Sequence, residues 1–127
     1  MKVFLGGTCN ESTWREELIP LLKIDYFNPV VDDWNEAAYN RELVERENCD
    51  ICLYVISPEM TGVYSIAEAI DDSNKRPEKT VFYFTDGFDH GQTKSLLAVA
   101  KMILKNGGWW RGGTLQDLAD FLNHYPK

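Results

Sequence analysis

The most constraining feature of this chain is a run of apolar residues, Ile51–Ile56, that ends at Ser57 and Pro58. A short apolar run without alternation is typical of a strand buried on both faces, and such strands belong to parallel sheets covered by helices. A helix is expected soon afterwards, over residues 66–73. The segment therefore predicts one β-α unit of an α/β protein.

The same alternation of strand and helix patterns runs from end to end. Further strands are expected at residues 3–5, Asp25–Phe27, Thr80–Phe84 and Trp109–Trp110, and further helices at 13–23, 34–47, 92–105 and 114–123. Such β-α units predict an α/β three-layer sandwich around a five-stranded parallel sheet. Right-handed crossovers favour the flavodoxin-like order 2-1-3-4-5. Residues 1–127 are expected to form one domain, because the length suits a single core.

Two local patterns predict details of the helices. Thr13 and Glu16 have the spacing of a capping box, in which the side chain of Thr13 would cap the helix at 13–23. In the helix at 34–47, the side facing the sheet is predicted from its apolar residues, which are Ala37, Ala38, Leu43 and Val44.

Charge and composition exclude several function classes. The 127 residues carry a net charge of −7, which would repel a phosphate backbone, so no nucleic acid polymer is expected as partner. A nucleoside or other small metabolite stays possible. No apolar run approaches the ~20 residues of a membrane span, so no membrane contact is expected. The absence of a signal-peptide pattern and the odd number of cysteines predict a cytoplasmic protein with reduced thiols.

A metal or organic cofactor is not expected. Cys49 and Cys52 have the C-x-x-C spacing, but Cys52 falls inside the predicted strand. Neither a second cysteine pair nor a nearby histidine completes a zinc ligand set. A metal or redox role is therefore not expected for the two cysteines.

The site is expected where the carboxyl ends of the strands meet. In a sheet of this order the switch point lies between the first and third strands, so the loops that follow them should carry the ligand site. Gly6, Ser57 and Glu68 are predicted to surround one crevice there. A carboxylate such as Glu68, near a helix N-terminus, can act as a nucleophile. The alternative is that Glu68 is an ordinary acidic residue of a first helical turn.

The other candidate residues also have structural alternatives. Gly6, Gly7 and Thr8 could admit a ligand close to the backbone or form a tight turn; they match neither the G-x-G-x-x-G nor the Walker pattern. Asp33 could bind sugar hydroxyls or cap a helix, and Trp34 could stack on a base or pack at the edge of a layer.

A pair on the second predicted helix has the same ambiguity. Tyr39 and Glu42 share a helical face, which would reach the crevice if that face leans over the first and third loops. Most acids on such a helix are solvated, so periodicity alone does not decide between the two interpretations.

Together these spacings resemble those of the nucleoside 2-deoxyribosyltransferase family. The stretch from Tyr39 to Leu43 reads Tyr-Asn-Arg-Glu-Leu and resembles the family's Tyr-Asn-x-Asp-Leu, whose acid is a catalytic-site carboxylate. Asp50 follows Glu42 by eight residues, and Glu68 follows Asp50 by eighteen, at the spacing of the family nucleophile. Pro58, the Gly6-Gly7 loop and the Asn-Pro-x-x-Asp-Asp-Trp stretch at 28–34 are also similar, so the likeness covers about residues 3–84.

The resemblance implies an enzyme that cleaves or transfers at the N-glycosidic bond of 2′-deoxyribonucleosides, with Glu68 as nucleophile and Glu42 as second catalytic acid. It implies no cofactor, a nucleoside or nucleobase as substrate, and a homo-oligomer. The residues expected to bind the substrate are Gly6, Gly7, Thr8, Asn10, Asp33, Trp34, Tyr39, Gly62 and Ser65.

Three positions depart from the family pattern. Gly62 stands where the family has a second aspartate, Phe4 stands where it has a tyrosine, and residues 64–67 replace its Gly-Thr-Ala or Gly-Leu-Gly. Three alternatives therefore stay open. They are a nucleotide N-glycoside hydrolase, a binding module that has lost turnover, and an interaction protein without a ligand.

Overall fold

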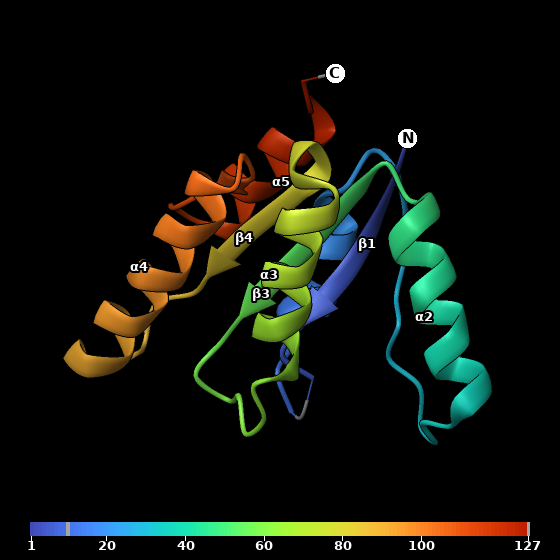
Figure 1. Ribbon diagram of the computed structural model, residues 1–127, viewed down its shortest axis with the longest axis horizontal. Coiled ribbons are helices and arrows are strands. Elements are labelled where there is room, and N and C mark those ends of the chain that lie inside the picture. Colours follow the sequence, from blue (N-terminus) through green and yellow to red (C-terminus); the bar gives the residue numbers. More distant parts are fainter. Residues whose placement is uncertain (10, 127) are drawn as a thin grey trace.

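Five parallel strands form the centre of the protein in the computed structural model, which describes residues 1–9 and 11–126. They are β1 (Lys2–Gly7), β2 (Asp25–Phe27), β3 (Ile51–Ile56), β4 (Thr80–Phe84) and β5 (Trp109–Trp110). All neighbouring pairs are parallel, and the order is β2-β1-β3-β4-β5. Figure 1 shows the three central strands, β1, β3 and β4, side by side. The predicted α/β class and the strand order 2-1-3-4-5 are confirmed.

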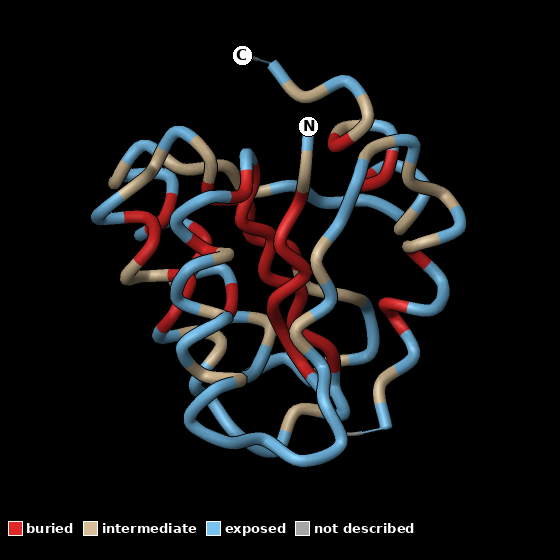
Figure 2. The backbone as a smooth tube through the Cα atoms, turned by 90° about the vertical axis from the view of Figure 1, so that its right-hand side faces the viewer, coloured by how far each residue is buried: buried red, intermediate tan, exposed pale blue. Residues whose placement is uncertain are grey.

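The buried strands explain why this sheet is the core. Every residue of β3 is buried, as expected for a central strand covered on both faces. Figure 2 shows the buried strands passing through the middle of the molecule, with exposed segments on both sides. The register sets Gly6 of β1 beside Tyr54 of β3, and Gly7 beside Val55. This pairing brings the carboxyl ends of β1 and β3 to the same edge of the sheet.

Helices cover both faces of the sheet. On one face lie α1 (Trp14–Leu18), a following 3-10 turn (Ile19–Leu21) and α5 (Leu115–Asn123). On the other lie α2 (Glu36–Asn48), α3 (Tyr64–Lys75) and α4 (His90–Lys105), all in front of the sheet in Figure 1. A second 3-10 turn, Pro77–Lys79, leads into β4.

Two apolar clusters separate the three layers. The cluster on the α1 and α5 face contains Val3, Leu5, Trp14, Leu18, Ile51, Leu53, Val55, Val81, Tyr83, Leu118, Ala119 and Leu122. The cluster on the α3 and α4 face contains Phe4, Cys49, Cys52, Tyr54, Ile56, Ala69, Phe82, Leu96, Ala100 and Ile103. Alternate residues of β1, β3 and β4 contribute to opposite clusters, as the pleat of a strand requires.

The first helix differs from its prediction. The side chain of Thr13 makes no capping hydrogen bond to the backbone, and its Oγ1 donates instead to Glu17 Oε2 at 3.3 Å. The α-helix also ends at Leu18, and the chain continues as a 3-10 turn through Leu21. Pro20 explains this early end, because it has no N–H to donate within a continuing helix.

The predicted inner side of α2 is wrong. Leu43 and Val44 are exposed, at 39% and 54%. Arg46 is the buried residue of the helix. The N-cap is Asn35, whose side chain accepts a hydrogen bond from the Ala38 N–H at 2.9 Å, and not Asp33. An ionic contact, described below, therefore turns this helix away from the orientation that its apolar residues predict.

In the part of the chain that the structure describes, no helix has both the length and the apolar character required to cross a membrane.

Candidate active site

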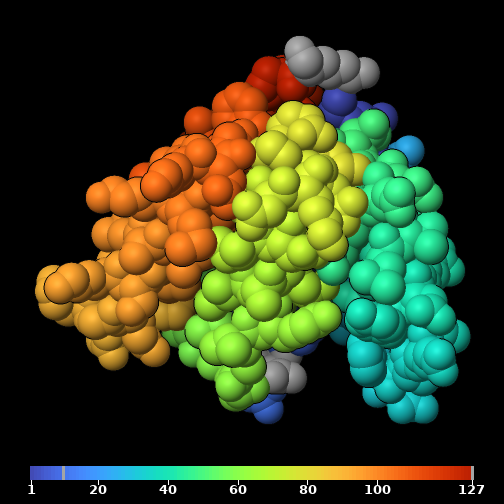
Figure 3. Space-filling model, viewed as in Figure 1, coloured from blue at the N-terminus to red at the C-terminus, as the bar shows by residue number. Residues whose placement is uncertain are grey.

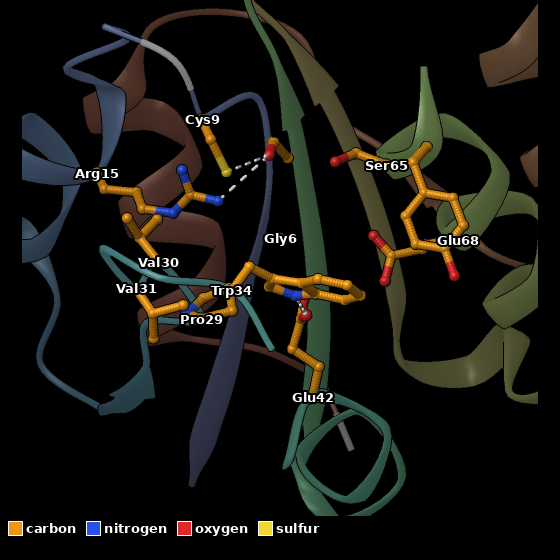
Figure 4. A pocket seen from close by; sticks show the side chains of 12 residues that line it. Gly6, Cys9, Arg15, Pro29, Val30, Val31, Trp34, Glu42, Ser65 and Glu68 are labelled. Carbon is orange, nitrogen blue, oxygen red and sulfur yellow. Dashed lines mark hydrogen bonds between the residues drawn. The ribbon is translucent and has the colours of Figure 1, made fainter. Parts of the chain in front are cut away.

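A crevice lies at the carboxyl ends of β1 and β3, between α2 and α3 (Figures 3 and 4). Its volume of about 340 Å³ is in the range of small-molecule pockets. Six of the predicted site residues line it, namely Gly6, Gly7, Trp34, Glu42, Ser65 and Glu68. The other lining residues are Cys9, Arg15, Pro29, Val30, Val31 and Tyr64. The crevice coincides with the switch point of the sheet, where ligands of such folds bind.

Gly6 and Gly7 form the β1 wall of the crevice because no larger residue fits there. A Cβ on Gly6 would lie 2.6 Å from Tyr54 Cε1. Gly7 has a φ of +127°, and a Cβ there would lie 2.0 Å from the Val55 carbonyl oxygen. Both glycines are therefore required by the contact between β1 and β3. They also leave the backbone bare on the side that faces the crevice.

Glu68 lies one turn inside α3, which begins at Tyr64. The favourable effect of a helix N-terminus on an anion fades after the first turn, so helix stabilisation alone does not explain this acid. The residue is 9% exposed. Burial raises the pKa of Glu68 to about 7, Arg46 opposes this rise, and the nearby carboxylates of Glu42, Asp72 and Asp71 add to it. Near neutral pH the side chain is thus divided between its acidic and ionised forms.

The carboxylate of Glu68 is held by a buried cluster of ion pairs around Arg46. Nη1 of Arg46 donates to Glu68 Oε2 at 3.3 Å. The same guanidinium donates to both oxygens of Asp72, from Nε at 3.2 Å and from Nη2 at 2.9 Å. The side chain of Arg46 is 4% exposed and that of Asp72 is fully buried. Although burial opposes ionisation, hydrogen bonds from Arg46 and Tyr54 hold the pKa of Asp72 below its usual range.

Arg46 was missed by sequence reasoning. Its carboxylate partners lie 22 to 26 residues further along the chain, on a different helix. Two signals could have found it. Arg46 follows Glu42 by one helical turn and so shares its face. Glu68, Asp71 and Asp72 also gather three acids on one short helical segment, which calls for a nearby cation.

Glu42 reaches the crevice from α2, on the wall opposite Glu68 (Figure 4). Its Oε2 accepts a hydrogen bond from Trp34 Nε1 at 2.9 Å. The indole of Trp34 packs edge-on against Tyr39, with ring centroids 5.5 Å apart. Trp34 is nevertheless 58% exposed, so much of its surface is available to a ligand. The face of α2 that carries Tyr39 and Glu42 therefore does lean over the crevice.

Arg15 is a second buried arginine that sequence reasoning missed. It makes four hydrogen bonds to the carbonyl oxygens of Leu5, Gly7 and Thr8, at 2.8 to 3.3 Å. Its guanidinium also stacks over the Trp14 ring at 4.3 Å. Arg15 thus holds the chain that follows β1 in place, and most N–H groups of its guanidinium are already bonded to backbone carbonyl oxygens.

Thr8 and Gly62 lie beside the main crevice. They line an adjoining hollow of about 150 Å³, which shares Gly7, Cys9, Tyr64 and Ser65 with it. Oγ1 of Thr8 accepts a hydrogen bond from the Ser57 N–H at 3.0 Å, so Thr8 also ties two loops together. A Cβ on Gly62 would meet no atom within 4 Å. A side chain at position 62 would therefore fit.

The remaining predicted residues lie elsewhere. Ser57 does not border the crevice as predicted; it lines a separate hollow with Ser12, because its side chain bonds to Ser12 Oγ at 2.8 Å. Asp33 is exposed and is not among the lining residues, and Tyr39 contributes through Trp34. A role for Asp33 in sugar binding stays a prediction. Asn10 lies outside the described residues.

Cys49 and Cys52 are free, buried thiols, and burial raises the pKa of each to about 12. Cys52 Sγ donates to the Arg46 carbonyl oxygen at 3.1 Å. Within residues 1–9 and 11–126, no group of three or more His, Cys, Asp or Glu side chains is arranged to hold a metal ion.

The parallel sheet of order 2-1-3-4-5 defines an α/β protein, and the crevice with its two carboxylates lies at the switch point, where small ligands of such folds bind. A family model described as nucleoside 2-deoxyribosyltransferase like matches residues 1–88, and the chain belongs to this family. The match runs from β1 beyond β4 and includes Glu42, Arg46 and Glu68. No curated protein matches the chain.

Proposed function

We propose that this protein cleaves or transfers the N-glycosidic bond of 2′-deoxyribonucleosides through a covalent glycosyl-enzyme on Glu68. The single observation that carries the proposal is the pair of carboxylates, Glu68 and Glu42, on opposite walls of one crevice of nucleoside size. Family membership supports the same chemistry. Breaking this bond builds positive charge on C1′, which a carboxylate beneath the sugar stabilises.

In the first step, an ionised oxygen of Glu68 attacks C1′ and forms a C–O ester bond. The C1′–N bond breaks, and its electron pair stays on the base nitrogen. Because the pKa of Glu68 is about 7, a useful fraction is ionised at neutral pH. Its partial burial removes water that would otherwise shield the carboxylate from the sugar carbon.

Glu42 is assigned to the departing base. The indole of Trp34 bonds to Oε2 of Glu42, so Oε1 is the oxygen that delivers a proton to the base. The exposed surface of Trp34 suits stacking on the base ring. The second step reverses the first: a nitrogen of another base attacks C1′, releases the Glu68 carboxylate and returns a proton to Glu42. Water in place of the base gives hydrolysis.

A nucleoside fits this crevice better than a nucleotide. Arg15 is the basic residue among those that line it, and its guanidinium is already bonded to backbone carbonyl oxygens. The two lining carboxylates, Glu42 and Glu68, would repel a phosphate group. A nucleotide hydrolase is therefore the weaker alternative for this chain.

A binding module without turnover is the other alternative, and Gly62 is the residue that favours it. The family places an aspartate there, and the open space around Gly62 admits one. If the loss of that aspartate has weakened turnover, Gly62→Asp should raise the rate while binding changes little. A protein that binds deoxynucleosides but does not react with them, with or without this substitution, would favour the binding module.

The test is to incubate the protein with mixed deoxynucleosides and free bases and to follow exchanged and hydrolysed products by mass spectrometry. Glu68→Gln keeps the size of the side chain and removes the charge, so it should reduce turnover by several orders of magnitude. Glu47→Gln makes the same change at an exposed position of α2 and serves as control. Near-normal turnover in Glu68→Gln would rule out the mechanism.

The proposal includes a homo-oligomer. Besides Trp34, several large apolar side chains are exposed around the mouth of the crevice and on α2, namely Val30, Val31, Leu43, Val44, Val63 and Tyr64. A second copy of the chain would remove them from water. Sedimentation analysis should then give a mass above that of the monomer, and a monomer at all concentrations tested would contradict this part.

A further inference from the structure

The ionic cluster behind Glu68 is more elaborate than a helix contact requires. Arg46 leaves α2 and contacts three acids of α3: its Nη1 reaches Glu68, while Nη2 reaches Asp72 and Asp71, the latter at 3.2 Å. The side chain of Arg46 is 4% exposed, so these bonds form away from water. Burying a guanidinium is unfavourable unless its partners are well placed, which points to a use for this arrangement.

Asp72 is the anchor that holds Arg46 in one orientation. Its two oxygens accept a fork of hydrogen bonds from Nε and Nη2 of Arg46. Tyr54, a fully buried residue of β3, donates its hydroxyl to Oδ2 of the same carboxylate, and Arg76 Nε donates to Oδ1 at 2.9 Å. With Asp72 tied to the sheet by Tyr54, the Arg46 fork is fixed in plane, and Nη1 is directed at Glu68.

We propose that Arg46 is a positioning residue for Glu68, clamped by Asp72 and Tyr54. It holds Oε2 of Glu68, so that Oε1 is the oxygen presented to the crevice and to C1′ of the sugar. This inference rests on the proposed function, because it assigns Arg46 a part in the same glycosyl transfer. Arg46 does not itself line the crevice, and it acts through Glu68.

The positive charge of Arg46 offsets the effect that several nearby carboxylates have on Glu68. The groups that face Glu68 or share its crevice are Arg46 and Glu42 on α2, Asp71, Asp72 and Tyr64 on α3, Cys9 after β1, and Arg15 on α1. Burial and the three acids raise the pKa of Glu68, and Arg46 lowers it. Without this guanidinium, Glu68 would be ionised only at higher pH, and attack on C1′ would require more alkaline conditions.

Lysine cannot reproduce this arrangement. One ammonium carries the charge, but it has no planar fork that could grip both oxygens of Asp72 and still direct a donor at Glu68. Arg46→Lys therefore separates orientation from charge, and Arg46→Met removes both.

Arg76→Met provides the matched control. Arg76 bonds to the same oxygen of Asp72 as Arg46 does, but no bond joins it to Glu68 among the described residues. Loss of Arg76 thus tests the general effect of weakening the cluster.

The experiment measures the pH dependence of kcat for deoxyribosyl exchange in the four proteins. The acidic limb reports the ionisation of Glu68, so it should lie near pH 7 in the wild type. It should move upward by on the order of one unit in Arg46→Met, and by less in Arg46→Lys. It should stay unchanged in Arg76→Met. An unmoved limb in both Arg46 variants, or an equal shift in Arg76→Met, would overturn the proposal.

A second readout does not depend on activity. The side-chain carboxyl of Glu68 can be titrated by carbon NMR with ¹³C-labelled glutamate, and Glu68→Gln identifies its resonance. The midpoint of the Glu68 titration should rise in Arg46→Lys. It should also rise in Tyr54→Phe, which keeps every charge of the cluster and therefore serves as the test if an Arg46 variant misfolds. Unchanged midpoints in both would refute the role of Arg46. Shifted midpoints in a protein that neither exchanges nor hydrolyses deoxynucleosides would refute the proposed function and leave the clamp in place.

Discussion

The α1 and α5 layer and the junction between α2 and α3 are held in place in different ways. On the α1 and α5 face, Trp14, Leu18, Leu118 and Leu122 are buried at 0 to 2% exposure and close the layer with apolar contacts. On the other face, α2 joins α3 through Arg46 and its acids, while Leu43 and Val44 point to solvent.

This difference separates the part of the molecule that mainly stabilises the fold from the part that carries the proposed catalytic groups. The contacts that close the α1 and α5 face are mainly apolar, so they have no pH dependence of their own. The α2–α3 junction replaces apolar packing with charged groups, so a carboxylate can be kept partly dry with a pKa of about 7. The substitutions below should therefore affect turnover and pH-dependent stability at the α2–α3 junction, and pH-independent stability on the α1 and α5 face.

After the loss of turnover already predicted for Glu68→Gln, the largest effect is expected from Glu42→Gln at the α2–α3 junction. Losing a proton donor typically lowers a rate by ~10²–10⁴-fold, so kcat for exchange should fall by that factor. The free energy of unfolding should change little, because Glu42 is only half-buried and keeps an acceptor oxygen for Trp34. Rates for activated leaving groups, which need no proton, should fall much less. An equal loss for activated and ordinary bases would contradict the role of Glu42.

On the α1 and α5 face, Leu118→Ala should reduce the free energy of unfolding by about 2–5 kcal/mol, because it removes a fully buried side chain. The loss should be the same at pH 5 and pH 8, and kcat of the folded protein should be preserved. Urea titration at both pH values measures it. Leu104→Ala, at a residue of α4 that is 48% exposed, is the control and should change stability by less than about 0.5 kcal/mol.

A pH-dependent stability change is expected from Glu68→Gln. The carboxyl binds its proton more tightly in the folded state, with a pKa of about 7 against the ordinary 4.5. Its contribution to stability is therefore complete below pH 4.5 and is lost as the pH rises through 7. The variant, which cannot ionise, should gain on the order of 2–3 kcal/mol relative to wild type between pH 5 and pH 8. A difference that does not change with pH would show that folding does not raise the pKa of Glu68.

The smallest effect is expected from Trp34→Phe. The substitution keeps an aromatic surface and removes the N–H that donates to Glu42. One such hydrogen bond contributes about 0.5–1.5 kcal/mol, so kcat/KM should fall by up to about tenfold. Steady-state kinetics with purine and pyrimidine substrates measures it. A loss as large as that of Glu42→Gln would mean that Trp34 does more than orient this carboxylate.

The strands were predictable because a short, unbroken apolar run between turn residues is typical of a covered parallel strand. The predicted bounds of Asp25–Phe27, Ile51–Ile56, Thr80–Phe84 and Trp109–Trp110 agree with the structure. The orientation of α2 was not predictable in the same way, because periodicity assumes that apolar residues face inward. In α2 the inward-facing position is taken by Arg46, and Leu43 and Val44 are exposed to solvent.

The site was predictable in part for a similar reason. Glu68 and Glu42 follow from family spacing and from the switch-point rule, and the crevice brings them together with Gly6 and Gly7. The arginines could not be placed, because their partners are set by three-dimensional packing: Arg46 by acids on another helix, and Arg15 by backbone carbonyl oxygens of β1 and its loop. The backbone partners of Arg15 leave no pattern in the sequence, and those of Arg46 leave only the indirect signal of three acids close together on α3.

The most direct test of the mechanism is to look for the glycosyl-enzyme itself. The protein is mixed with excess deoxynucleoside, quenched in acid within the first turnovers and digested, and the peptides are weighed by mass spectrometry. The mechanism predicts a deoxyribosyl adduct on the peptide that contains Glu68, absent from Glu68→Gln and discharged when free base is added before quenching. Active turnover without an adduct on that peptide, or an adduct on another residue, would contradict it.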